Sequence, residues 1–128
     1  MKATLIETEG YGLKAVIEID GRRLNVMDDI SLPGKSAESG TEFDIELSPM
    51  CLGDQTWDEM FKGNPEKKMD IEPLNGWKYM AFGKIAQINP VIVDCGILKL
   101  RDVIHTRDDW CIGKYVAINI NRLDAIAR

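Results

Sequence analysis

Residues 13–27 read Leu-Lys-Ala-Val-Ile-Glu-Ile-Asp-Gly-Arg-Arg-Leu-Asn-Val-Met. Apolar and polar side chains alternate on both sides of the dipeptide Asp20-Gly21, and this is the period of a β-strand with one buried face. An Asp-Gly pair accepts the positive φ angles of a type I′ turn. The stretch therefore predicts a β-hairpin, and it indicates a protein built mainly from strands.

The flanking residues extend this pattern. Residues 2–9 precede the turn-forming Gly10-Tyr11-Gly12 and predict a first strand, which completes a three-stranded meander. Residues 28–40 have no period and are rich in Pro, Gly and Ser, so we expect an exposed loop. Residues 41–48 then alternate apolar with acidic or polar side chains and predict a half-buried strand.

The middle of the chain loses the alternation. Between residues 49 and 76 we expect an irregular segment with one short helix near 54–62, capped by Asp54 and ended by Gly63. Its apolar side chains fall at helical spacing: Trp57, Met60 and Phe61. The helix could plug one end of the sheet, which we favour, or it could be a specialised insertion.

The C-terminal part returns to strands. Residues 77–88 predict a long strand with a bend or bulge at Gly83, and Asn89-Pro90 turns the chain. Residues 91–101 predict one returning strand with a second bend at Gly96. Residues 114–120 predict a last strand whose inward side chains are Val116, Ile118 and Ile120.

These segments predict an all-β fold that is mainly antiparallel. We expect one domain over residues 1–128, with N-terminal strands in 1–48, the irregular segment in 49–76 and C-terminal strands in 77–128. About seven short strands with bent long members favour a small barrel or strongly coiled sheet, OB-fold-like or of another Greek-key type. Such an architecture implies no particular function by itself.

Composition excludes several classes of protein. The 128 residues carry a formal net charge of −5, which is the wrong sign for binding nucleic acid through bulk charge. The chain has no apolar run of the roughly 18 residues that a membrane helix needs. The three cysteines are odd in number and widely spaced, and the first residues do not resemble a signal peptide. We therefore expect reduced thiols and a cytoplasmic protein.

The sequence offers few catalytic arrangements. The one histidine, His105, has no thiol at a known catalytic or zinc-binding spacing, and Gly34-Lys35-Ser36 lacks the earlier glycine of a phosphate-binding loop. We assign no catalytic residue, metal ligand or cofactor. The acidic pairs Asp28-Asp29 and Asp108-Asp109 leave a small hydrolase or metal-dependent enzyme as a third alternative.

Charge and aromatic residues favour a non-enzymatic binding domain that recognises another protein. Residues 41–73 hold nine acidic and three basic side chains. The same segment contains Trp57 and Phe61, residue types that often anchor protein interfaces. We expect this region to attract a basic partner.

A second interpretation places an aromatic and basic face on the C-terminal strands. If Met80 and Phe82 point inward, the outward side chains are Trp77, Tyr79, Lys99, Arg101 and Tyr115. Rings interleaved with cations suit single-stranded nucleic acid or a small anionic ligand. The alternative is that the rings belong to the core and the cations solubilise strand edges.

Overall fold

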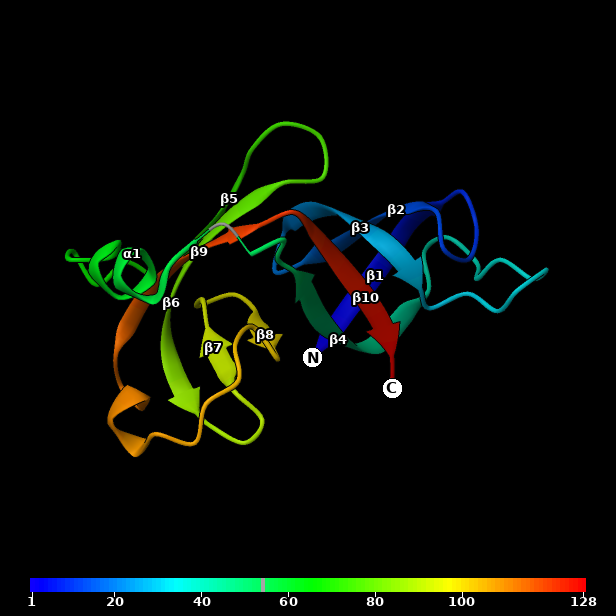
Figure 1. Ribbon diagram of the computed structural model, residues 1–128. Helices are drawn as coiled ribbons and strands as arrows, with labels where there is room; N and C mark the ends of the chain where they lie inside the picture. Colours follow the sequence, from blue (N-terminus) through cyan, green and yellow to red (C-terminus); the bar gives the residue numbers. More distant parts are fainter. Residues whose placement is uncertain (54) are drawn as a thin grey trace.

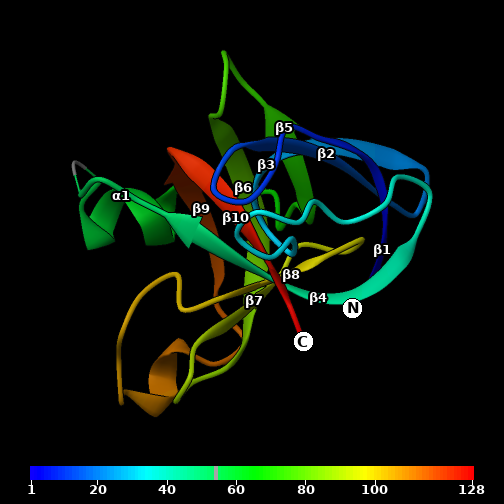
Figure 2. The same cartoon turned by 90° about the vertical axis from the view of Figure 1, so that its right-hand side faces the viewer.

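The structure is a computed structural model and describes residues 1–53 and 55–128. Five strands form a closed barrel, which lies at the right of Figure 1 and faces the viewer in Figure 2. They are β1 (Lys2–Thr8), β2 (Lys14–Ile19), β3 (Arg22–Asp29), β4 (Glu42–Met50) and β10 (Arg122–Ala127). Around the barrel their order is β1, β2, β3, β10, β4 and back to β1. The prediction of a small all-β barrel is confirmed.

The predicted hairpin forms strands β2 and β3. Asp20 and Gly21 have φ angles of 48° and 78°, the positive values that a type I′ turn requires. The two strands pair antiparallel with Ile17 opposite Leu24, and both side chains are buried inside the barrel. Alternation along the sequence therefore fixes which face of the hairpin is covered.

Strand β10 closes the barrel and was not among the strands predicted from the sequence. It runs parallel to β3 and antiparallel to β4. Leu123 and Ala125 point into the barrel and are fully buried. Arg122 and Asp124 alternate with them on the outer face, where Arg122 Nε lies 2.6 Å from Asp124 Oδ1.

The chain between β4 and β10 forms a second group of strands, at the left of Figure 1. The central strand β6 (Tyr79–Gln87) pairs with β9 (Tyr115–Ile120) on one edge. On its other edge it pairs with β5 (Asp70–Pro73) and β7 (Ile92–Asp94). The remaining elements are helix α1 (Trp57–Lys62), β8 (Lys99–Arg101) and the short 3-10 helix η1 (Asp109–Cys111). Strand β5 lies in the segment that was predicted to be irregular, so that prediction missed one strand.

Residues 91–101 form a hairpin instead of the predicted single bent strand. Strands β7 and β8 pair antiparallel, with Val93 opposite Leu100 and both side chains fully buried. Gly96 lies in the turn between them with a φ of 90°, which glycine adopts without a steric penalty. The glycine therefore reverses the chain direction at a position where only a bend was predicted.

The predicted bulge at Gly83 is also misplaced. Strand β6 keeps a regular register with β9 through Gly83, and its register shift against β7 falls between Ile85 and Gln87. A Cβ atom on Gly83 would lie 2.5 Å from the carbonyl oxygen of Asp94 and 2.8 Å from Cγ1 of Val93. Glycine is thus required here because β7 approaches the backbone of β6 closely.

Besides the pairing of β8 with β4, the side chains of Tyr79 and Arg22 join the second group of strands to the barrel. Tyr79 Oη accepts a hydrogen bond from the backbone nitrogen of Asn25 at 2.7 Å and donates one to its carbonyl oxygen at 3.0 Å. Arg22 Nη1 donates to Asp70 Oδ1 at 2.6 Å, and Arg22 Nη2 donates to the carbonyl oxygen of Ile71. Strand β10 pairs with residues 27–29 of β3, so the Tyr79 hydroxyl supplies hydrogen-bond partners to the backbone of Asn25, which β10 leaves free, while Arg22 does the same for a carbonyl of β5.

The predicted exposed loop 28–40 begins with a buried carboxylate, which corrects part of that prediction. Asp28 is fully buried and accepts hydrogen bonds from the backbone nitrogens of Ile30 and Ser31 and from the hydroxyls of Ser31 and Thr8. Burial raises the pKa of this carboxyl, but the hydrogen bonds from Ser31, Thr8 and Ile30 outweigh it, and the pKa lies below its ordinary value. Asp28 therefore holds the start of the loop against β1.

Candidate binding surface

Helix α1 presents two aromatic side chains on the surface. It begins at Trp57 after the N-cap Thr56, whose hydroxyl accepts a hydrogen bond from the backbone nitrogen of Glu59 at 3.1 Å. Asp54, the predicted cap, lies outside the described residues. Met60 is buried, whereas Trp57 is 42% exposed and Phe61 is partly buried. The helix is thus anchored by Met60 and leaves Trp57 and Phe61 at its outer side.

The helix ends at Gly63, as predicted, and a close contact explains the glycine. A Cβ atom there would lie 2.8 Å from the Cβ of Ala117 on β9 and 2.8 Å from the carbonyl oxygen of Glu59. The end of the helix is therefore pressed against the sheet. This contact fixes the position of the aromatic side chains over β9.

A third ring, Trp110, completes an aromatic cluster. It belongs to η1, where the neighbouring Cys111 is fully buried and Trp110 is 55% exposed. Ring centroids are 5.5 Å apart for Trp57 and Phe61, 5.1 Å for Phe61 and Trp110, and 6.5 Å for Trp57 and Trp110. These distances are typical of interacting aromatic pairs. We call Trp57, Phe61 and Trp110 the aromatic cluster.

Sequence reasoning selects Trp57 and Phe61 but misses Trp110. The tryptophan follows the acidic pair Asp108-Asp109, in a stretch whose alternation is lost. Only the tertiary packing of η1 beside α1 brings it to the other rings. The one signal in the sequence is a large aromatic residue next to a cysteine in a polar loop.

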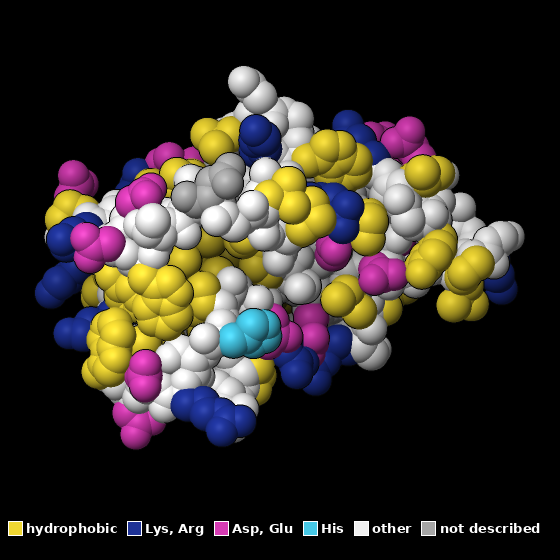
Figure 3. Space-filling view, in the orientation of Figure 1, with side chains coloured by type: hydrophobic (Ala, Val, Ile, Leu, Met, Phe, Trp, Pro, Cys, Tyr) yellow, Lys and Arg dark blue, Asp and Glu magenta, His cyan; other side chains and the backbone are white. Residues whose placement is uncertain are grey.

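A groove of about 490 Å³ adjoins the cluster at Trp57. In Figure 3 yellow side chains gather at the left of the molecule and continue into this hollowed region. The wall formed by buried side chains includes Met60, Tyr79, Val103, Ile118 and Ile120. At the rim, Leu52 is 66% exposed and Leu74 is 51% exposed. Together the groove and the aromatic cluster form an apolar surface of the kind that marks interaction sites.

Gln55 closes the edge of β9 along this groove. Its Nε2 donates to the carbonyl oxygen of Ala117 at 2.7 Å, and its Oε1 accepts from the backbone nitrogen of Asn119 at 3.0 Å. The side-chain amide thereby replaces one residue of a neighbouring strand. The groove is therefore polar at the strand edge and apolar across its wall.

Acidic side chains border the aromatic cluster. Asp58 and Glu59 lie on α1, and Asp108 and Asp109 lie beside Trp110. Asp58 is paired with Lys62, with 2.9 Å between Oδ2 and Nζ. Within residues 1–53 and 55–128 no ion pair is formed by the other three. The carboxylates around the aromatic cluster thus favour a cationic group on a binding partner.

Tyr79 does not lie on the surface, so its predicted outward orientation is wrong. It is 2% exposed and faces the interior together with Ala81 and Ile85. Met80 and Phe82, predicted to point inward, lie on the opposite, partly exposed face. Both faces of strand β6 carry apolar residues, so the sequence pattern does not decide which face is buried. The hydrogen bonds between Tyr79 and β3 place the tyrosine in the interior. Burial accordingly raises the pKa of the Tyr79 hydroxyl.

The remaining residues of the predicted aromatic and basic face are not brought together. Trp77 is 36% exposed and lines a separate hollow of about 270 Å³. Tyr115 is partly buried, with Lys67 Nζ 5.9 Å from its ring centroid. Lys99 and Arg101 lie on β8 and line another hollow. The predicted single surface is therefore dispersed over three places.

The thiols and His105 do not assemble into a reactive site. Burial raises the pKa of the Cys95 thiol to about 12, and Cys111 is fully buried. Cys51 is exposed and lines the groove. His105 lies in a different hollow, near Arg107. Across the part of the chain that the structure describes, no three His, Cys, Asp or Glu side chains are grouped as metal ligands.

No family model, curated protein or solved structure matches the chain. Among the described residues, no helix has both the length and the apolar character to cross a membrane. The candidate site therefore has to be interpreted from its own geometry.

Proposed function

We propose that the protein is a binding domain that docks a segment of another protein on the aromatic cluster and the adjoining groove. The observation that carries the proposal is the cluster itself: Trp57 and Trp110 are 42% and 55% exposed and lie beside a groove of about 490 Å³. Exposing two tryptophans to water is unfavourable, and interfaces are enriched in such anchors.

The chemistry of the surface specifies the partner segment. Exposed Leu52 and Leu74 at the rim, and the buried wall behind them, suit large apolar side chains. Glu59, Asp108 and Asp109 suit lysine or arginine at the flanks of the segment. We therefore expect the partner to present an apolar segment with basic residues beside it. Electrostatic attraction would speed association, and the apolar contacts would slow dissociation.

Selection from a library of short random peptides tests this proposal with the full chain. We expect the selected peptides to combine large apolar residues with Lys or Arg. Trp57→Ala and Trp110→Ala should each weaken their binding about tenfold or more, since the truncation of an interface anchor typically costs that much. Fluorescence anisotropy of labelled peptides measures the affinity, and binding should weaken as salt rises.

Trp77→Ala is the matched control, because Trp77 is also a partly exposed tryptophan but lines a different hollow. It should leave peptide affinity unchanged. The proposal is wrong if no peptide is enriched, or if the enriched peptides bind Trp57→Ala and Trp110→Ala as tightly as the unmodified protein. Loss of binding in Trp77→Ala alone would instead place the binding site on the other hollow.

A further inference from the structure

The turn between β5 and β6 contains the one Asn-Gly pair of the chain, Asn75-Gly76, and both residues are exposed. Two backbone hydrogen bonds hold this turn. The nitrogen of Leu74 donates to the carbonyl oxygen of Lys78 at 2.9 Å, and the nitrogen of Lys78 donates to the carbonyl oxygen of Asn75 at 3.2 Å. Gly76 has a φ of 64°, which glycine adopts without a steric penalty. The turn therefore keeps the pair in contact with water.

Neither reactive group of the pair is engaged elsewhere in the fold. Among the described residues, the side-chain amide of Asn75 takes part in no hydrogen bond, and the backbone nitrogen of Gly76 donates none. Glycine has no side chain that would hinder the approach of its nitrogen to the preceding residue. The nitrogen of Gly76 can therefore reach the side-chain carbonyl carbon of Asn75.

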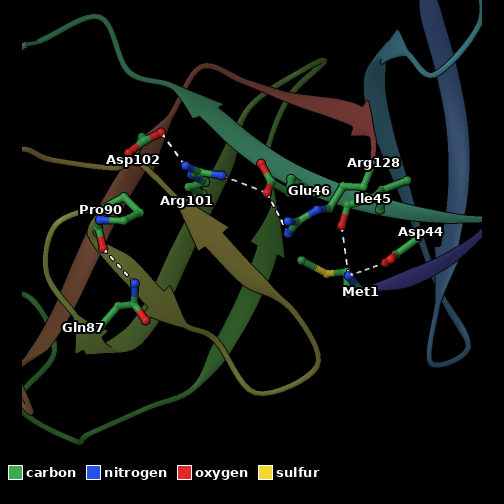
Figure 4. Close-up of polar contacts among 9 residues, drawn as sticks. All are labelled: Met1, Asp44, Ile45, Glu46, Gln87, Pro90, Arg101, Asp102 and Arg128. Carbon is green, nitrogen blue, oxygen red and sulfur yellow. Dashed lines mark hydrogen bonds and ion pairs between the residues drawn. The ribbon is translucent and has the colours of Figure 1, made fainter.

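Two other asparagines lack a nitrogen that could react in this way. Asn64 and Asn89 each precede a proline, whose ring nitrogen carries no hydrogen. Figure 4 shows one of these prolines, Pro90, whose carbonyl oxygen accepts a hydrogen bond from Nε2 of Gln87 at 3.3 Å. Ring closure onto either asparagine is therefore blocked.

The remaining asparagines are held by the surrounding structure. Asn25 and Asn119 lie in strands β3 and β9, and each precedes a β-branched residue whose side chain crowds its nitrogen. Asn121 precedes an arginine, and its amide oxygen accepts a hydrogen bond from the backbone nitrogen of Leu52 at 2.9 Å. Asn75 is thus the asparagine that combines exposure, a free amide and an unhindered neighbouring nitrogen.

We propose that Asn75 is a site of self-modification, because asparagine side chains are chemically labile where the chain leaves them free. The backbone nitrogen of Gly76 attacks Cγ of Asn75, the new C–N bond closes a succinimide ring, and the side-chain nitrogen leaves as ammonia with the proton that Gly76 loses. Water then opens the ring. Attack at Cγ gives aspartate, and attack at the backbone carbonyl carbon of Asn75 gives isoaspartate. Water is the only co-reactant, and nothing is oxidised or reduced.

The modification would change a loop that separates two hollows of the surface. Leu74 and Lys78 line the groove, whereas Trp77 lines the hollow of about 270 Å³. Either product adds a negative charge between them, and isoaspartate also lengthens the backbone and shifts Leu74 relative to Trp77. The reaction itself requires only the exposed pair and water, so it does not depend on the proposed binding function.

Incubation of the full chain for several days in mildly alkaline ¹⁸O-labelled water, followed by tryptic digestion in ordinary water and mass spectrometry, tests the proposal. Trypsin releases residues 69–78, in which Asn75 is the only asparagine. We expect this fragment to exchange an amide NH₂ for OH and to gain one labelled oxygen. Conversion during the digestion would carry no label. Chromatography should separate an aspartate form and an isoaspartate form.

A synthetic peptide of residues 69–78 and one variant are the matched controls. Asn75 in the folded chain should convert within about tenfold of the rate in the peptide, because exposed turns open locally at little cost in free energy. Asn75→Gln keeps a side-chain amide, but its additional methylene requires a larger ring. This variant should show no labelled conversion in residues 69–78, and its circular dichroism should match that of the unmodified protein.

The proposal is wrong if Asn75 converts more than about tenfold more slowly in the folded chain than in the peptide, since the turn would then protect the pair. It is also wrong if only aspartate forms, because direct hydrolysis of the amide would give that product alone. Faster conversion at another asparagine, or labelled conversion that persists in Asn75→Gln, would place the reaction elsewhere in the chain.

Discussion

The barrel and the second group of strands satisfy their backbone groups in different ways. Each barrel strand has a neighbouring strand on both sides, so backbone hydrogen bonds close the ring. Strands β5 and β9 each have one neighbouring strand, and side chains complete their outer edges: Arg22 beside β5 and Gln55 beside β9. Within the part of the chain that the structure describes, the barrel therefore has no unpaired strand edge that a partner could bind. The second group of strands presents a groove and three aromatic rings at its surface.

The largest effect should come from the strand that closes the barrel. Leu123→Ala should lower the free energy of unfolding by about 2–5 kcal/mol, because Leu123 is fully buried and its truncation leaves a cavity. Urea denaturation measures the loss. Ile126→Ala on the same strand is the control and should cost less, since Ile126 is only partly buried. Equal losses would contradict the assignment of β10's inner face.

Asp28→Asn should cost about 2–3 kcal/mol at neutral pH, because the carboxylate accepts four hydrogen bonds in a buried site. The pKa of Asp28 is lowered in the folded protein. Its charged form therefore stabilises the fold above the unfolded pKa of about 3.9, and this contribution is lost as pH falls through the folded pKa.

The difference in unfolding free energy between the unmodified protein and Asp28→Asn should accordingly shrink when the pH is lowered below about 4. Urea denaturation at several pH values measures it. Asp29→Asn is the control, because this neighbouring carboxyl is partly exposed and no hydrogen bond to it is found among the described residues, so the change should alter stability little. A difference that stays constant down to low pH would argue against the carboxylate as the stabilising group.

The junction between the two regions should be weakened by Tyr79→Phe. The change removes one hydroxyl and leaves the backbone groups of Asn25 without their partner, which should cost about 1–2 kcal/mol. Tyr115→Phe provides a matched control, because no hydrogen bond of the Tyr115 hydroxyl is found among the described residues. If both variants lose the same stability, the Tyr79 contact does not couple the regions.

A smaller effect is expected at the edge of β9. Gln55→Ala removes two hydrogen bonds beside the groove, where water can replace them, so stability should fall by about 1 kcal/mol or less. Hydrogen exchange at the amide of Asn119 should nevertheless become faster, because that nitrogen donates to Gln55. Unchanged exchange at Asn119 would contradict the proposed role of the glutamine.

The difference between the barrel and the second group of strands also explains how much of the fold could be predicted from the sequence. The strands β1 to β4 have clear alternation and a decisive Asp20-Gly21 turn, so local pattern was sufficient. Strand β10 was missed because one of its two buried positions is the small Ala125, which gives a weak apolar signal. Residues 79–83 carry apolar side chains on both faces of the strand, and only the hydrogen bonds of Tyr79 to β3 decide which face is buried. For the candidate site, Trp57 and Phe61 followed from helical spacing.

Trp110 could not be predicted in the same way. It lies far from α1 in the sequence, and the packing of η1, anchored by Cys111, brings its ring within 5.1 Å of Phe61. Likewise, Lys99 and Arg101 were assigned to a face with Trp77, whereas the turn at Gly96 directs them to another hollow. Long-range packing, rather than local period, determines the composition of the candidate sites.

If Trp57 is a surface anchor rather than a plug of the core, its truncation should cost less stability than that of Met60, and urea denaturation of Trp57→Ala beside Met60→Ala measures the difference. Trp57 is 42% exposed and Met60 is 6% exposed. We predict that Trp57→Ala lowers the free energy of unfolding by about 1–2 kcal/mol, through the loss of its partly exposed contacts with Phe61 and Trp110, whereas Met60→Ala lowers it by about 2–5 kcal/mol. A loss of about 3–5 kcal/mol in Trp57→Ala, the range for emptying a buried aromatic site, would show that Trp57 belongs to the core and that α1 has a purely structural role.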